Sequence, residues 1–97
     1  MILEVAILDV KPGQSSEFES AFRRAEAILT SSKGHLSHEL HRSIETPDRY
    51  ILLVRWERLE DHTEGFRKSP GYQEWKGRLH KFYDPFPEVE RYSLLRF

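Results

Sequence analysis

Hydrophobic residues in this chain follow two periods, and the shorter one marks two strands that are apolar on both faces. In residues 2–10, one alternating set contains Ala6, Leu8 and Val10 together with Glu4, and the other contains Leu3, Val5 and Ile7. In residues 50–57, one set is Tyr50, Leu52, Val54 and Trp56, and the other is Ile51, Leu53 and Arg55. Because successive side chains of a strand point to opposite faces, both segments predict strands buried on both sides, at the centre of a sheet.

Two other segments are more polar and predict strands outside this central pair. Residues 35–44 alternate a few aliphatic positions with histidine, serine and charged residues, which indicates an edge strand. A hairpin turn at residues 45–48 joins it to the strand at 50–57, and Pro47 in that turn cannot belong to a central ladder. After a break at residues 83–87, residues 89–97 predict a last strand.

The longer period, 3.6 residues, predicts helices. Ser16 and Glu19 have the spacing of a capping box, and Gly34 marks the end of the helix that follows. The apolar stripe of this helix consists of Phe18, Ala21, Phe22, Ala25, Ile28 and Leu29. A short helix carries Leu59, His62 and Phe66, and a second starts at Ser69-Pro70 and continues through Tyr72, Trp75, Leu79 and Phe82.

The predicted order βαββααβ is that of an α+β, ferredoxin-like domain over residues 1–97, with a four-stranded antiparallel sheet and helices on one face. The helices cannot cover both faces of this sheet. Ile51 and Leu53, with one face of residues 2–10, would then be exposed. We therefore expect a homodimer in which two sheets pack face to face and form an α/β barrel across two chains.

Composition narrows the possible functions. Fifteen basic and sixteen acidic residues give a net charge of -1, which argues against nucleic acid and membrane surfaces as partners. The Gly-Phe-x-Phe strand signature of RNA-binding modules is also missing. The 97 residues contain no cysteine, no apolar run long enough to span a membrane and no signal at the N-terminus, so the expected location is the cytoplasm.

Five histidines raise the question of a metal site. His35, His38 and His41 lie on one predicted strand, where regular alternation would turn His38 away from the other two. His35 and His41 would be about 20 Å apart along that strand. We therefore expect no metal site in this segment, while His62 and His80 could meet only through tertiary packing.

Several short motifs occur in a fixed order along the chain. They are Lys11-Pro12-Gly13 with Phe18 and Phe22, Gly34-x-Leu36, Glu39-Leu40-His41-Arg42, Pro47-Asp48-Arg49-Tyr50, and Trp56-Glu57 followed by His62, Phe66, Ser69 and Tyr72. Over essentially its full length the chain resembles the antibiotic biosynthesis monooxygenase family of small dimeric α+β barrel proteins. The resemblance implies oxidation of a small, electron-rich aromatic such as a phenol, hydroquinol or anthrone by molecular oxygen, without a cofactor.

A site of this kind needs a base, polar contacts for the substrate anion and a dry aromatic pocket. His62 is the natural base because its ordinary pKa lies near 6.5, although it could equally lie at a helix surface. Trp56 could stack on a planar substrate or simply pack in the core, and Tyr72 could orient a substrate oxygen. Phe66, Trp75 and Tyr50 are expected substrate-binding residues. Arg55 could balance an anion or pair with a carboxylate at the dimer interface.

Two alternatives remain open. The domain could be a non-catalytic module that binds a small ligand or supports assembly. It could also degrade haem, but relatives with that activity carry an axial histidine where this chain has Lys76, and an asparagine in the first strand that residues 2–10 lack. His80, one turn after Lys76, could substitute as the ligand.

Overall fold

The computed structural model describes residues 1–97 and confirms the predicted order of elements. The elements are β1 (Ile2–Asp9), α1 (Ser15–Thr30), β2 (His35–Arg42), β3 (Arg49–Trp56), the π-helix η1 (Asp61–Phe66), α2 (Pro70–Leu79), the 3-10 turn η2 (His80–Phe82) and β4 (Val89–Ser93). The four antiparallel strands are ordered β2-β3-β1-β4, so β1 and β3 are central and β2 is an edge strand, as predicted. This is the ferredoxin-like α+β fold.

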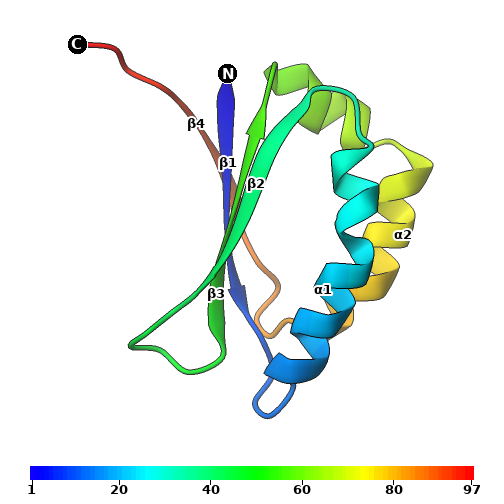
Figure 1. The fold of residues 1–97 in the computed structure, drawn as a ribbon, viewed down its shortest axis with the longest axis vertical. Helices are drawn as coiled ribbons and strands as arrows, with labels where there is room; N and C mark the ends of the chain where they lie inside the picture. The colour runs from blue at the N-terminus through cyan, green and yellow to red at the C-terminus, as the bar shows by residue number, and fades with distance from the viewer.

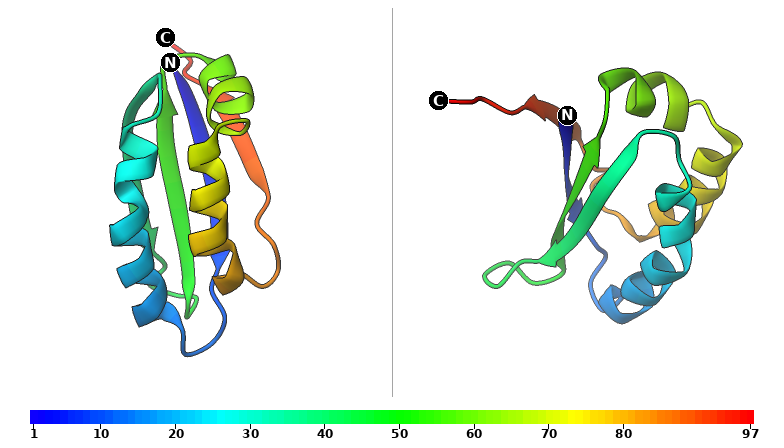
Figure 2. Two further views of the ribbon diagram at one scale, coloured as in Figure 1. Left: turned by 90° about the vertical axis from the view of Figure 1, so that its right-hand side faces the viewer. Right: turned by 45° about the horizontal axis from the view of Figure 1, so that its top comes forward.

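Both long helices lie side by side on one face of the sheet (Figures 1 and 2). The core between the layers takes the alternating residues of the central strands that face the helices. From β3 these residues are Tyr50, Leu52, Val54 and Trp56. From β1 and the residue after it they are Ala6, Leu8 and Val10, with Glu4 as the one charged residue. α1 contributes the predicted stripe, in which Phe18 and Ala25 are fully buried.

The start of α1 differs from the prediction. The helix begins at Ser15, its N-cap is Gln14, and no side chain caps it. The predicted capping box is wrong because Ser16 lies inside the helix instead of at its N-cap, and Glu19 accepts hydrogen bonds from Tyr50 and Arg42. The Ser15 hydroxyl donates to Asp48 at 2.5 Å. The cap of α2 is as predicted, with Ser69 accepting the Tyr72 N–H at 3.1 Å.

A bulge in β2 changes which of its histidines share a face of the sheet. The register with β3 shifts between His35 and Ser37, so His35 and His38 lie on the same face of the sheet. His35 Nε2 lies 2.9 Å from His38 Nδ1, and His38 Nε2 lies 2.7 Å from Glu26 Oε2. A bulge adds one residue to a strand and inverts the alternation beyond it, which is why regular alternation predicted the opposite arrangement.

The last strand is shorter than predicted. β4 ends at Ser93, and residues 94–97 extend away from the body of the molecule, where Leu94, Leu95 and Phe97 are largely exposed (Figure 1). The hairpin strands also end earlier, β2 at Arg42 and β3 at Trp56. The longest helix, α1, has 16 residues, and no helix has the length and apolarity of a membrane span.

Candidate functional site

A cavity of about 380 Å³ lies between the inner face of the sheet and the segment from η1 to β4. Its apolar wall includes Ala6, Leu8, Leu52, Phe66, Trp75 and Val89. Its polar groups are Glu4, His62, Arg67, Tyr72, His80, Tyr83 and Arg91. A hollow of this size, in which hydrophobic lining residues outnumber the polar ones and a few polar groups converge, is typical of a small-molecule site.

The π-helix η1 turns three of these residues toward the cavity. The Arg67 backbone N–H donates to the His62 carbonyl at 3.0 Å, which is the i to i+5 bond of a π turn. The wider turn places His62, Phe66 and Arg67 together on the cavity side. Gly34 permits this packing, because a Cβ at that position would lie 2.1 Å from the Asp61 carboxylate at the start of η1.

Glu4, Trp56 and His62 form a buried cluster at one end of the cavity. The Trp56 indole Nε1–H donates to Glu4 Oε1 at 2.9 Å, and His62 Nε2 lies 3.3 Å from the same oxygen. The rings of Trp56 and His62 are stacked, with centroids 5.5 Å apart and planes 17° apart. His62 Nδ1 is buried and has no hydrogen-bond partner in the chain.

Burial shifts the acid–base properties of this cluster. Desolvation, assisted by the positive charges of Arg67 and Arg91, lowers the pKa of His62 to about 4, so the ring is neutral at neutral pH. Desolvation raises the pKa of Glu4, an effect that the Trp56 hydrogen bond and the two arginines partly oppose. Glu4 is therefore a stronger base than an exposed glutamate, and His62 is a weaker base than expected from its ordinary pKa.

The far wall of the cavity is aromatic. The Tyr72 ring lies 5.4 Å from Phe66 and 6.1 Å from His80, and the Arg67 guanidinium lies 5.6 Å from the Tyr72 ring centroid. Burial, followed by the charges of Lys76 and Arg67, lowers the pKa of His80. This wall presents flat apolar surfaces to a planar ligand and keeps a hydroxyl and a neutral imidazole beside them.

The structure brings four of the seven predicted site residues to the cavity: His62, Phe66, Tyr72 and Trp75. Trp56 lies behind the wall, fully buried and in contact with Glu4 rather than with the cavity.

Tyr50 and Arg55 do not line this cavity, and Arg55 has the carboxylate partner that the sequence offered as its alternative. Tyr50 lies at the other end of β3, where its hydroxyl donates to Glu19. Arg55 lies on the opposite face of the sheet and pairs with Glu39 at 2.9 Å. Strand alternation already separated Arg55 from Trp56, and the 3.3 Å rise per residue carries Tyr50 beyond reach of the cavity.

Sequence reasoning missed Glu4, Arg67 and Arg91 as site residues. The sequence marks Glu4 as a possible site residue, because it is the single charge on the inner face of a central strand. Arg91 could be found only from the β1–β4 register, in which it lies directly opposite Glu4. The sequence does not mark Arg67, because its position depends on the π turn.

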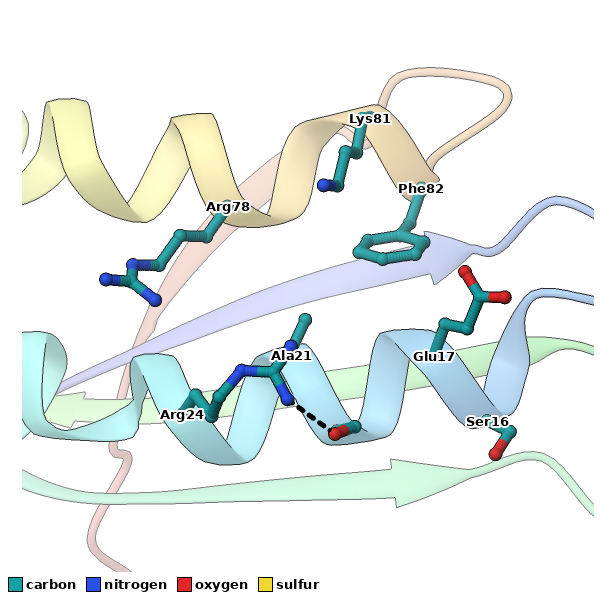
Figure 3. Close-up of a pocket in the computed structure, with 8 residues that line it drawn as sticks. Ser16, Glu17, Ala21, Arg24, Arg78, Lys81 and Phe82 are labelled. Atoms are coloured by element: carbon teal, nitrogen blue, oxygen red, sulfur yellow. Dashed lines mark hydrogen bonds between the residues drawn. The ribbon is translucent and has the colours of Figure 1, made fainter.

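A second hollow, of about 470 Å³, lies between α1 and α2 on the outer side of the molecule (Figure 3). Arg24, Arg78 and Lys81 extend over it, with Ala21 and Phe82 as its apolar residues. Arg24 donates to Ser20 at 2.7 Å, and Arg78 donates to Glu74 at 2.7 Å. Because these guanidinium groups already have partners and only two of the eight lining residues are hydrophobic, the groove is a poorer candidate for a small-molecule site.

The model of the family described as antibiotic biosynthesis monooxygenase matches residues 1–78. The chain belongs to this family. The uncharacterized protein YczJ of Bacillus subtilis is 53% identical over 93 residues, which cover 96% of this chain and 98% of YczJ. A candidate antibiotic biosynthesis monooxygenase from Bordetella bronchiseptica has a similar structure, with a TM-score of 0.92 and 34% identity, and the match covers 98% of this chain and 97% of that one.

SnoaB of Streptomyces nogalater, described as a cofactor-independent oxygenase, has a TM-score of 0.84 at 21% identity. The match covers 99% of this chain and 94% of SnoaB. At this identity the likeness shows a shared fold. The structure groups no three histidine, aspartate or glutamate side chains in an arrangement that could hold a metal ion.

Proposed function

We propose that this protein is a cofactor-independent monooxygenase that oxidises a small, electron-rich aromatic with molecular oxygen. The observation that carries the proposal is Glu4, a buried carboxylate with a raised pKa on the wall of an aromatic-lined cavity, in a chain of the monooxygenase family. A phenol, hydroquinol or anthrone reacts with oxygen after losing a proton. The cavity supplies the base, and its aromatic side chains pack against the substrate.

Glu4 is the group we propose to accept that proton, in place of His62. At neutral pH the His62 ring is already neutral, and a pKa of about 4 makes it a poor acceptor of a phenol proton. Glu4 Oε1 contacts the Trp56 indole N–H and His62 Nε2, whereas Glu4 Oε2 has no hydrogen-bond partner within the chain. His62 and Trp56 then act as positioning residues that hold the carboxylate against the cavity wall.

The redox step balances without a cofactor. The deprotonated substrate carbon forms a bond to dioxygen, and the O–O bond and the C–H bonds of that carbon break. One oxygen atom stays on the carbon as a carbonyl and the other leaves as water with the two hydrogens. The substrate supplies all four electrons, as in the oxidation of an anthrone to an anthraquinone. Tyr72 can donate its hydroxyl to a substrate oxygen, and the Phe66 and Trp75 rings pack against the substrate plane. The protein thus binds, deprotonates and shields the substrate while dioxygen acts as the oxidant.

We also propose that the working form is a homodimer joined through the sheets. The sheet face that no helix covers carries a row of aliphatic residues: Leu3, Val5, Ile7, Ile51 and Leu53. Ile7 is 48% exposed, although it lies at the middle of the sheet. A contiguous apolar face of this kind favours an isologous contact with a second copy, and the exposed residues 94–97 extend from the same sheet.

Oxygen uptake tests the proposal. The metal-stripped protein is mixed with dihydroxynaphthalenes, hydroquinones and anthrones, and uptake is compared among wild type, Glu4→Gln and His62→Ala. We expect Glu4→Gln to lower kcat by about a hundredfold or more, and His62→Ala to lower it less. Glu74→Gln, which removes an exposed carboxylate from α2 and away from both the cavity and the uncovered sheet face, is the matched control.

The outcomes separate the alternatives. Binding of these compounds without any oxygen uptake by the wild type would favour a ligand-binding module. Full activity of Glu4→Gln would remove Glu4 from the proposed chemistry. A saturable shift of the Soret band of hemin would instead favour haem as the ligand.

A further inference from the structure

Arg67 and Arg91 line the cavity without an acidic partner. The chain forms nine ion pairs within 4.0 Å, and neither arginine takes part in one. Other surface arginines are also unpaired, but these two lie on the wall of the same cavity. They come from different elements, the end of η1 and the middle of β4.

The register of the sheet explains why Arg91 faces inward. Glu4 on β1 and Arg91 on β4 are directly opposite each other, so both side chains leave the same face of the sheet. The two do not form an ion pair, because the Glu4 carboxylate is turned toward the Trp56 indole and His62. The guanidinium of Arg91 is thereby left free beside the cavity.

Arg67 is oriented by an aromatic neighbour. Its guanidinium lies 5.6 Å from the centroid of the Tyr72 ring, a cation–π contact that aligns the group along the aromatic wall. Both arginines are close enough to Glu4 and His62 to act on the pKa of each. They therefore lie near the groups that would meet the substrate.

The charges of the cavity favour an anion. Two permanently positive guanidinium groups face one carboxylate, and the lowered pKa of His62 and His80 keeps both imidazoles neutral at neutral pH. A guanidinium binds a carboxylate with two parallel hydrogen bonds, which gives orientation as well as affinity.

We propose that the ligand of this cavity is an aromatic acid: a planar ring with an oxidisable hydroxyl and a carboxylate on the same ring system. Arg67 and Arg91 bind the carboxylate, and the hydroxyl is directed toward Glu4. The assignment of the hydroxyl rests on the proposed function, whereas the recognition of the carboxylate rests on the two arginines alone.

The experiment compares an acid with its uncharged analogue of nearly equal shape. Hydroxynaphthoate and the matching hydroxynaphthamide are titrated into the protein by calorimetry under anaerobic conditions, so that turnover does not contribute. We expect the acid to bind about tenfold more tightly than the amide at low salt, and this preference to shrink at about 0.5 M salt. Arg67→Gln and Arg91→Gln should each reduce the preference several-fold, and the double variant should abolish it.

Arg24→Gln is the matched control, because it removes the same charge from the groove between α1 and α2 and should leave the preference unchanged. Circular dichroism checks that each variant is folded. Equal binding of acid and amide, no binding of either, or a preference that survives the double variant would overturn the proposal. Preferential binding of the acid without oxygen uptake in a separate assay would uphold this inference and contradict the proposed monooxygenase activity.

Discussion

Because His62 is buried and neutral, we expect the free energy of unfolding to fall as the pH is lowered. In the folded chain its pKa is about 4, compared with 6.5 for an unperturbed histidine, so the unfolded chain binds a proton that the folded chain excludes between these values. Above about pH 6.5 both states carry a neutral ring, and this contribution to stability is complete. As the pH falls from 6.5 to 4, the contribution is lost at about 1.4 kcal/mol per pH unit, about 3 kcal/mol in all.

This loss is large for a domain whose free energy of unfolding is expected to be about 5 to 15 kcal/mol. Glu4 acts with the opposite sign, because its raised pKa lets the folded chain hold a proton that the unfolded chain has released. A plot of the wild-type free energy of unfolding against pH therefore contains both effects. Comparison with His62→Gln, which keeps a side-chain N–H donor but cannot titrate, isolates the histidine.

The assay is urea unfolding between pH 4 and 7.5, followed by tryptophan fluorescence at a fixed protein concentration, since both Trp56 and Trp75 are buried. His62→Gln should flatten the acid side of the stability curve. His41→Gln, which removes a histidine whose side chain is 56% exposed, should leave it unchanged. Parallel curves for wild type and His62→Gln across this range would refute the assignment of a neutral, desolvated ring.

Further predictions concern packing and assembly. Gly34→Ala should lower the free energy of unfolding by about 2 kcal/mol or more, because the new Cβ would meet the Asp61 carboxylate and φ at this position is +83°. Gly13→Ala, where φ is +79° but the surrounding space is open, should lower it by only about 1 kcal/mol. Identical thermal melting curves for the two variants would contradict this expectation. If the proposed homodimer forms through the uncovered sheet face, Ile51→Asp should be a monomer in light scattering after gel filtration, and a dimer that survives would contradict this interface.

Much of the fold could be predicted because the relevant signals are local. Two strands with apolar residues on both faces had to be central, and the polar segment at residues 35–44 had to be an edge. Ser69-Pro70 marked a helix start that the structure confirms. At the start of α1 the prediction is wrong, and there Glu19 bonds to Tyr50 rather than to its own helix.

The site was less predictable because it depends on geometry that leaves little trace in sequence. The π turn that brings Arg67 beside His62 has no residue signature, and the bulge that unites His35 with His38 inverts a simple alternation. His62 was recognisable as a site residue, but its burial, and hence its weakened basicity, follows only from the packing around it. Glu4 is recognisable in the sequence as a lone charge on the apolar face of a central strand.

The fate of the two oxygen atoms tests the central claim most directly. The wild-type protein is incubated with an aromatic acid that supports oxygen uptake under 18O2, and the product is analysed by mass spectrometry. A monooxygenase places one labelled oxygen atom in the product and the other in water, and Glu4→Gln should form almost no labelled product. Formation of hydrogen peroxide with an unlabelled product would contradict the account, as would labelling that is unaffected by the loss of the Glu4 carboxylate.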